Sequence, residues 1–179
     1  MVNWEGIIDK YYSDNRELRD LLILHSRSVA RKALEIANRY PMEGFDLEFI
    51  QQASMLHDIG IFLTYAPSIR CSGSSPYICH GLLGAELLRK EGLPAHALVC
   101  ERHTGAGISL SQILSNNMPL PHRDMLPVSK EETLICYADK FYSKTSPYRE
   151  KTFREVEISL QKFGDEGMDR FREWRKMFG

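Results

Sequence analysis

Residues 54–61, SMLHDIGI, place an imidazole and a carboxylate side by side at the end of an apolar run. The apolar spacing before them predicts a helix that starts near Asp46, carries His57 on its apolar face and ends near Gly60, where the chain turns away. Burying an unpaired carboxylate such as Asp58 is unfavourable by several kcal/mol. The doublet of His57 and Asp58 therefore needs partners from elsewhere in the chain.

The composition is that of a globular protein. The chain has 179 residues, of which 43% are hydrophobic and 26% charged, which excludes a disordered chain. A domain of this length buries roughly 70% of its unfolded surface, enough to enclose a polar site. With 23 basic and 24 acidic residues, the formal net charge is −1, and charge alone gives no reason to expect a nucleic-acid partner.

The N-terminal stretch lacks the basic start and apolar core of a secretory signal, and no apolar run approaches the length of a membrane span. We therefore expect a cytoplasmic protein with no membrane partner. Four cysteines, at positions 71, 79, 100 and 136, form no C-x-x-C pair, and three of them lie in apolar helical patterns. This pattern predicts reduced, mostly buried thiols.

Apolar residues recur with a helical period almost throughout, and alternating strand-like runs are missing. The sequence predicts an all-α, single-domain helical bundle over residues 1–179, with a metal-site core at about 20–145. Helices are expected at about residues 4–12, 16–40, 46–60, 77–92, 94–103 and 133–144, with one or two amphipathic helices at about 149–178. Residues 64–76 are expected to form an exposed loop. A second loop is expected at residues 116–132. Its last four residues, SKEE, resemble a capping box for the helix that follows.

Polar side chains interrupt the apolar patterns of five separate expected helices. They are His25, His57, Asp58, His80, His103 and Asp139. One histidine on an apolar face is usually a hydrogen-bonded core residue, but this larger group includes two carboxylates that need a counter-charge. A shared cation satisfies all of them, and imidazole with carboxylate suits first-row divalent ions.

Six ligands exceed the need of one ion. They suit two divalent metal ions, with Asp58 as a bridge and open positions for water and substrate. Iron or manganese is favoured, and zinc, nickel, cobalt and magnesium are alternatives. His96, near the expected solvent-facing start of its helix, falls outside this group.

The ligand order, within LHSRSVA, LHDIG, CHGLLGAELL, ERHTGAGI and LICYADK, resembles the HD superfamily of metal-dependent phosphohydrolases in its HDIG form. The resemblance covers roughly residues 22–144. The chain is similar to small single-domain HDIG proteins and to HD-type hydrolases of dinucleoside tetraphosphates. The resemblance implies a first metal at His25, His57, Asp58 and Asp139, and a second at His80 and His103.

The family resemblance implies hydrolysis of a phosphoester or phosphoanhydride, with a nucleotide as the expected small phosphorylated substrate. His57 and Asp58 are the expected catalytic residues, because two ions lower the pKa of a bound water and Asp58 can accept its proton. Two alternatives stay open. Mixed-valent di-iron oxygenases of the HD fold use the same ligand order, and some HD modules bind without catalysis. The oligomeric state is also open, a homodimer included.

Many HDIG enzymes carry a substrate-binding lysine after the glycine, where this chain has Ile61. A phosphate-binding cation must then come from elsewhere in the chain. The candidate substrate contacts are Arg27, Arg70, Arg102, His122, Arg123, Lys140 and Lys144.

Overall fold

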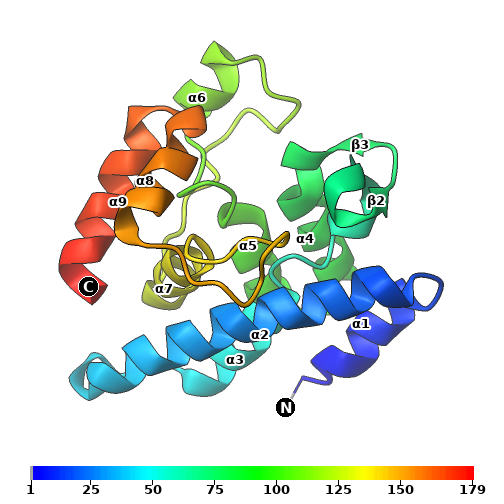
Figure 1. The fold of residues 1–179 in the computed structure, drawn as a ribbon, viewed down its shortest axis with the longest axis horizontal. Coiled ribbons are helices and arrows are strands. Elements are labelled where there is room, and N and C mark those ends of the chain that lie inside the picture. The colour runs from blue at the N-terminus through cyan, green and yellow to red at the C-terminus, as the bar shows by residue number, and fades with distance from the viewer. Residues whose placement is uncertain (1) are drawn as a thin grey trace.

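The computed structural model describes residues 2–179 and shows the expected all-α fold (Figure 1). The long helix α2 (Arg16–Arg39) runs along one side of the molecule, with α1 (Trp4–Tyr12) and α3 (Leu47–Leu56) packed against it. The side chain of Asn15 caps α2 by accepting a hydrogen bond from the Leu18 backbone nitrogen. The predicted apolar face of α2 is buried and includes His25.

Helices α4 (His80–Lys90) and α5 (Pro94–Arg102) form an antiparallel pair in the middle of the fold. Their connection turns at Gly92, whose φ of +75° favours glycine, and Pro94 occupies the first turn of α5. The helix α7 (Lys130–Asp139) packs against α2, α3 and α5. These helices enclose the centre of the molecule.

The exposed loop expected at residues 64–76 is instead folded into short regular elements, together with the residues on either side of it, 61–63 and 77–79. Residues 61–79 form the short helices η2 (Ile61–Leu63), η3 (Pro67–Ile69) and η4 (Tyr77–Cys79) and the strands β1 (Thr64–Ala66), β2 (Cys71–Ser72) and β3 (Ser75–Pro76). The strand order is β2-β1-β3, with β2 antiparallel and β3 parallel to β1. Thr64, Ile69 and Cys71 are buried. Strands of two or three residues are too short to show an alternating pattern in sequence.

The C-terminal half adds α6 (Leu110–Ser115), α8 (Phe153–Leu160), η5 (Gln161–Phe163) and α9 (Asp165–Phe178). Of the one or two amphipathic helices expected at about 149–178, the structure shows two, α8 and α9. The capping box predicted at Ser129 is confirmed and begins α7. Helix α6, which begins with a capping box of its own at Ser109, was not predicted because it is only six residues long. Aromatic rings from α7 and α9, such as Tyr137 and Phe171, pack together and hold this part of the chain against the centre.

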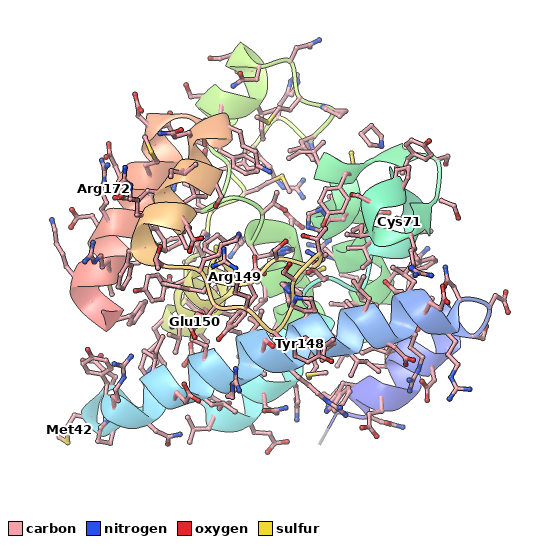
Figure 2. The ribbon with its side chains drawn as sticks, in the orientation of Figure 1. Met42, Cys71, Tyr148, Arg149, Glu150 and Arg172 are labelled. Atoms are coloured by element: carbon pink, nitrogen blue, oxygen red, sulfur yellow. The ribbon has the colours of Figure 1, made fainter. Side chains whose placement is uncertain are left out.

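All four cysteines are free and buried, as predicted, with Cys71 in the small sheet (Figure 2). Within residues 2–179, no helix combines the length and the apolar character needed to cross a membrane.

Candidate metal centre

Three helices point their C-terminal ends at the same place. His57 caps the end of α3, His103 caps the end of α5, and Asp139 is the last residue of α7. The last carbonyl groups of a helix lack partners and carry a partial negative charge. Their convergence therefore favours a cation at this point. His25 reaches it from the middle of α2, and His80 from the first residue of α4.

The six predicted ligands are all buried and form two groups that share Asp58. In each group, the atoms able to ligate a metal lie within 4.8 Å of one another. The first group is His25, His57, Asp58 and Asp139, and the second is Asp58, His80 and His103. We call these six residues the ligand cluster.

The two carboxylate oxygens of Asp58 face different pairs of imidazoles. Oδ2 lies 3.2 Å from Nε2 of His25 and 3.1 Å from Nε2 of His57. Oδ1 lies 3.3 Å from Nε2 of His80 and 3.3 Å from Nε2 of His103. This is the arrangement expected of a carboxylate that bridges two cations.

Three of the imidazoles are oriented in the same way. In His57, His80 and His103, Nδ1 lies 2.7 Å from the backbone carbonyl oxygen three residues earlier. Nδ1 therefore carries the proton that is donated, and Nε2 is left with a lone pair directed at the centre. Nε2 of His80 and Nε2 of His103 lie only 3.1 Å apart. Two lone pairs at that distance repel unless a cation or proton lies close to both.

The chemistry of the cluster fits a metal. Within residues 2–179, buried polar atoms without a hydrogen bond include Nε2 of His57 and both oxygens of Asp58, although Lys144 forms an ion pair with Asp58. Buried polar groups rarely lack a partner, because losing their hydration costs about 1–3 kcal/mol per group. Divalent cations at the two groups would satisfy these atoms.

Charge interactions set the protonation of the cluster. Burial alone would raise the pKa of Asp58, but Lys144 and His57 outweigh it and hold that pKa well below its usual range. Burial would also lower the pKa of His57, but Asp58 and Asp139 raise it to about 9. Burial lowers the pKa of His103 to about 4. Without a metal ion, His57 therefore carries a second proton, on Nε2, which a bound ion would displace.

The sequence profile of the HD domain matches residues 22–143. The chain belongs to the HD domain family. It is 34% identical over 121 residues to an uncharacterized protein of Methanocaldococcus jannaschii, a match that covers 66% of this chain and 64% of that protein. No solved structure matches the chain at a significant level.

Two further relatives are tRNA (cytidine(56)-2'-O)-methyltransferases. The one from Picrophilus torridus is 27% identical over 157 residues, covering 82% of this chain and 41% of the relative. The one from Thermoplasma volcanium is 29% identical over 140 residues, covering 78% and 36%. The chain thus spans less than two thirds of the length of each of these three relatives.

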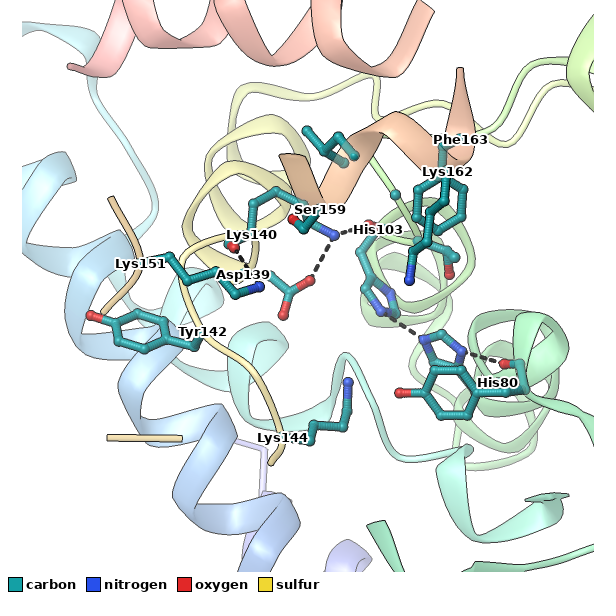
Figure 3. Close-up of a pocket in the computed structure, with 14 residues that line it drawn as sticks. His80, His103, Asp139, Lys140, Tyr142, Lys144, Lys151, Ser159, Lys162 and Phe163 are labelled. Atoms are coloured by element: carbon teal, nitrogen blue, oxygen red, sulfur yellow. Dashed lines mark hydrogen bonds and ion pairs between the residues drawn. The ribbon is translucent and has the colours of Figure 1, made fainter. Parts of the chain in front are cut away.

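Two of the predicted cations reach the ligand cluster of this HD domain. Nζ of Lys144 lies 2.6 Å from Oδ2 of Asp58. Nζ of Lys140 lies 2.7 Å from Oδ2 of Asp139 and 2.9 Å from the carbonyl oxygen of His103 (Figure 3). Two ammonium groups are therefore present at the cluster even though Ile61 supplies none.

The structure does not bring the other predicted substrate contacts to this site. They are Arg27, Arg70, Arg102, His122 and Arg123, and they line neither of the two cavities beside the cluster. Three of the arginines, at positions 70, 102 and 123, pair with glutamates instead. Arg27 and His122 are exposed. A substrate role for these five residues stays a prediction without structural support.

Ile61 is fully buried in the apolar core. A lysine at this position would have to bury its charge. The Ile61 side chain therefore contributes to packing of the core and contacts no substrate. His96 is buried as well, which corrects its expected exposure. Helix α3 covers the start of α5, where Phe49 packs on the His96 ring and Oε1 of Gln52 lies 3.3 Å from its Nε2.

Gly60 has a different role from the expected turn. Its φ is −84°, which any residue can adopt. A Cβ atom at this position would instead collide with the backbone of α4 at His80 and Gly84. The glycine therefore allows the chain after Asp58 to lie directly against α4, which brings His80 to the cluster.

A cavity of about 160 Å³ opens beside His80, His103 and Asp139 (Figure 3). Its wall includes residues that the sequence did not single out. They are Tyr77, Thr104, Gly105, Tyr142, Lys151, Ser159, Leu160, Lys162 and Phe163. Most of them come from the segment after residue 139. In sequence, the lysines of that segment look like ordinary solvent-exposed charges, so nothing marked them as part of a site.

Proposed function

We propose that this HD domain is a metal-dependent phosphohydrolase that cleaves a phosphoester or phosphoanhydride, with a nucleotide as the expected substrate. The observation that carries the proposal is the position of Asp58. Its two oxygens each face a separate pair of imidazole Nε2 atoms. Within residues 2–179, both oxygens and Nε2 of His57 are buried without a hydrogen-bond partner, although Lys144 forms an ion pair with Oδ2. Such an arrangement supports two cations beside a cavity lined by lysines.

The first group of the ligand cluster would hold one ion and the second group the other, with Asp58 shared. Bound there, divalent ions would acidify water and offset the negative charge of a phosphoryl group. The family and the mixed imidazole and carboxylate ligands favour iron or manganese.

The protein's own groups prepare the cavity for a phosphoryl group. Lys140 and Lys144 place ammonium groups beside the two carboxylates, where they can donate charge-assisted hydrogen bonds to phosphoryl oxygens. The low pKa values of Asp58 and Asp139 keep both carboxylates ionised, so they act as cation ligands and not as proton donors.

Tyr77 orients the second group. Its ring stacks on the imidazole of His80 at a centroid distance of 4.6 Å, and its backbone carbonyl accepts the Nδ1 proton of the same histidine. Burial raises the pKa of Tyr77 to about 12, so the phenol keeps its proton and can donate to a bound anion. The residue thus fixes His80 and adds a donor to the cavity wall.

The proposal is tested by measuring phosphate release with added manganese or iron from mononucleotides, dinucleoside polyphosphates and cyclic dinucleotides. We expect turnover of at least one of these classes by the wild-type chain. The variant Asp58→Ala should lose at least about a thousandfold in rate, because both ions share this ligand. Asp20→Ala, at an exposed position on α2, is the matched control and should keep full activity.

Two results would overturn the proposal. Oxygen consumption with a polyol or a phosphonate, without phosphate release from any nucleotide, would assign the cluster to a di-iron oxygenase. Equal activity in the wild type and in Asp58→Ala would show that the cluster does not catalyse the reaction.

A further inference from the structure

The cavity beside the ligand cluster continues into a second one of about 360 Å³. The two cavities share six lining residues, namely Tyr77, Asp139, Tyr142, Lys144, Lys151 and Lys162. The second cavity extends away from the cluster toward η3 and residues 143–145. Its volume lies at the lower end of the range of small-molecule pockets, about 300–1,000 Å³. A ligand held at the cluster therefore has room to extend into it.

The lysines along these cavities are not equivalent. Lys140 and Lys144 each pair with a carboxylate of the ligand cluster. Lys151 and Lys162 form no ion pair within residues 2–179, and Asp139 is the one carboxylate among the residues that line either cavity. Two positive charges at the cavities are therefore left without a protein counter-charge.

The side chains lie where a ligand of the cluster would meet them. In Figure 3, Lys144 and Lys162 point from opposite sides into the space beside the two imidazoles, and Lys151 approaches Asp139. Nζ of Lys151 makes only a long contact, 3.5 Å, with the carbonyl oxygen of Lys140. Burial and the neighbouring lysines lower the pKa of Lys151, although Asp139 opposes the shift. An anion between these lysines would relieve their mutual repulsion.

We propose that Lys151 and Lys162, which we call the lysine rim, form a second anion subsite that binds a further phosphoryl group of the substrate. This inference rests on the proposed function, because it places the scissile phosphoryl group at the ligand cluster. The substrate class is then a compound with two or more linked phosphoryl groups, such as a nucleoside diphosphate or triphosphate. Ammonium groups serve such sites as point charges that attract phosphate oxygens.

The lysine rim lies outside the part of the chain that the HD profile matches, which ends at residue 143. Lys151 directly precedes the cap of α8, and Lys162 lies in η5 immediately after α8. Helix α8 therefore carries one rim lysine next to each of its ends. This segment would add substrate selectivity to a metal centre built from the matched residues.

The test is a calorimetric titration of the manganese-loaded full chain with two probes, inorganic phosphate and imidodiphosphate, a diphosphate analogue that resists hydrolysis. We expect imidodiphosphate to bind at least about tenfold more tightly than phosphate, because it can occupy both subsites. The double variant Lys151→Ala/Lys162→Ala should reduce this preference to within about twofold, with little change in phosphate affinity. Lys90→Ala, an exposed lysine on α4 away from both cavities, is the control.

An unchanged preference in the double variant, or an equal loss of affinity for both probes, would overturn the subsite. Because the titration needs no turnover, it is independent of the proposed reaction. A wild-type chain that releases no phosphate but keeps a lysine-dependent preference would contradict the hydrolase and support the subsite. A chain that hydrolyses nucleotides but shows no preference for imidodiphosphate would support the hydrolase and overturn the subsite.

Discussion

The ligand cluster and the lysine rim are built in different ways. The cluster comes from the family-matched core, where all six side chains are buried and four of them, at positions 57, 80, 103 and 139, are held at helix ends. The rim comes from the following segment; Lys151 is half-buried, Lys162 is exposed, and neither forms an ion pair within residues 2–179. The comparison teaches that the ligand cluster, which we propose holds metal ions, and the lysine rim, which we propose binds a second phosphoryl group, come from different parts of the chain. Changes to the core should therefore affect folding and metal binding, and changes near the rim should not.

The largest expected effect comes from Ile61→Lys. The substitution buries an ammonium group in the core beside the cluster, and we expect the free energy of unfolding to fall by about 3 kcal/mol or more. Ile158→Lys is the matched change near the rim, on the exposed face of α8, and should alter stability by less than about 0.5 kcal/mol. Urea unfolding of both variants measures the difference. Equal losses would contradict the contrast between core and rim.

Metal removal is the next test. An ion that binds only the folded chain, at a concentration of 100 times its Kd, adds about 2.7 kcal/mol of stability. For a chain of this length, a chelator should therefore lower Tm by about 5–10 °C. The shift should vanish in Asp58→Ala and persist in Lys151→Ala/Lys162→Ala, as scanning calorimetry would show. A chelator shift of the same size in Asp58→Ala would place the metal elsewhere.

A smaller effect is expected from Gly60→Ala. The added methyl group collides with the backbone of α4, and we expect a loss of about 1–3 kcal/mol together with weaker metal binding at His80. Gly167→Ala, in α9, meets nothing closer than 3.8 Å and should stabilise the chain by about 0.5–1 kcal/mol. Thermal unfolding should show a lower Tm than the wild type for Gly60→Ala and a higher Tm for Gly167→Ala. The same sign for both would show that Gly60 does not set the approach of α4.

The sequence predicts the fold class and the composition of the cluster well, because the signals are local. Each ligand interrupts a helical apolar pattern, and an unpaired buried carboxylate such as Asp58 has few explanations other than a cation. The order of the ligands then indicates the HD family, which the profile match confirms. Which oxygen of Asp58 faces which imidazoles depends on the packing of α4 against residue 60, and no local pattern encodes that contact.

The rest of the site depends on long-range packing. Lys151 and Lys162 look like solvated charges in sequence, and only the docking of α8 brings them to the cavity. The small sheet at residues 64–76 is too short to give a periodic signal. His96 is buried because α3 packs against it, and the apolar pattern of its own helix does not indicate this contact. These features become visible only when separate segments meet.

The most direct test of the central claim is the metal content of the full chain, purified without chelator and measured by elemental analysis. Two equivalents of a divalent transition metal per chain are expected, because Asp58 joins two groups of ligands. The variant His80→Ala/His103→Ala should retain one equivalent, held by the first group. A wild-type chain that binds no metal, even after incubation with iron or manganese, would contradict the account.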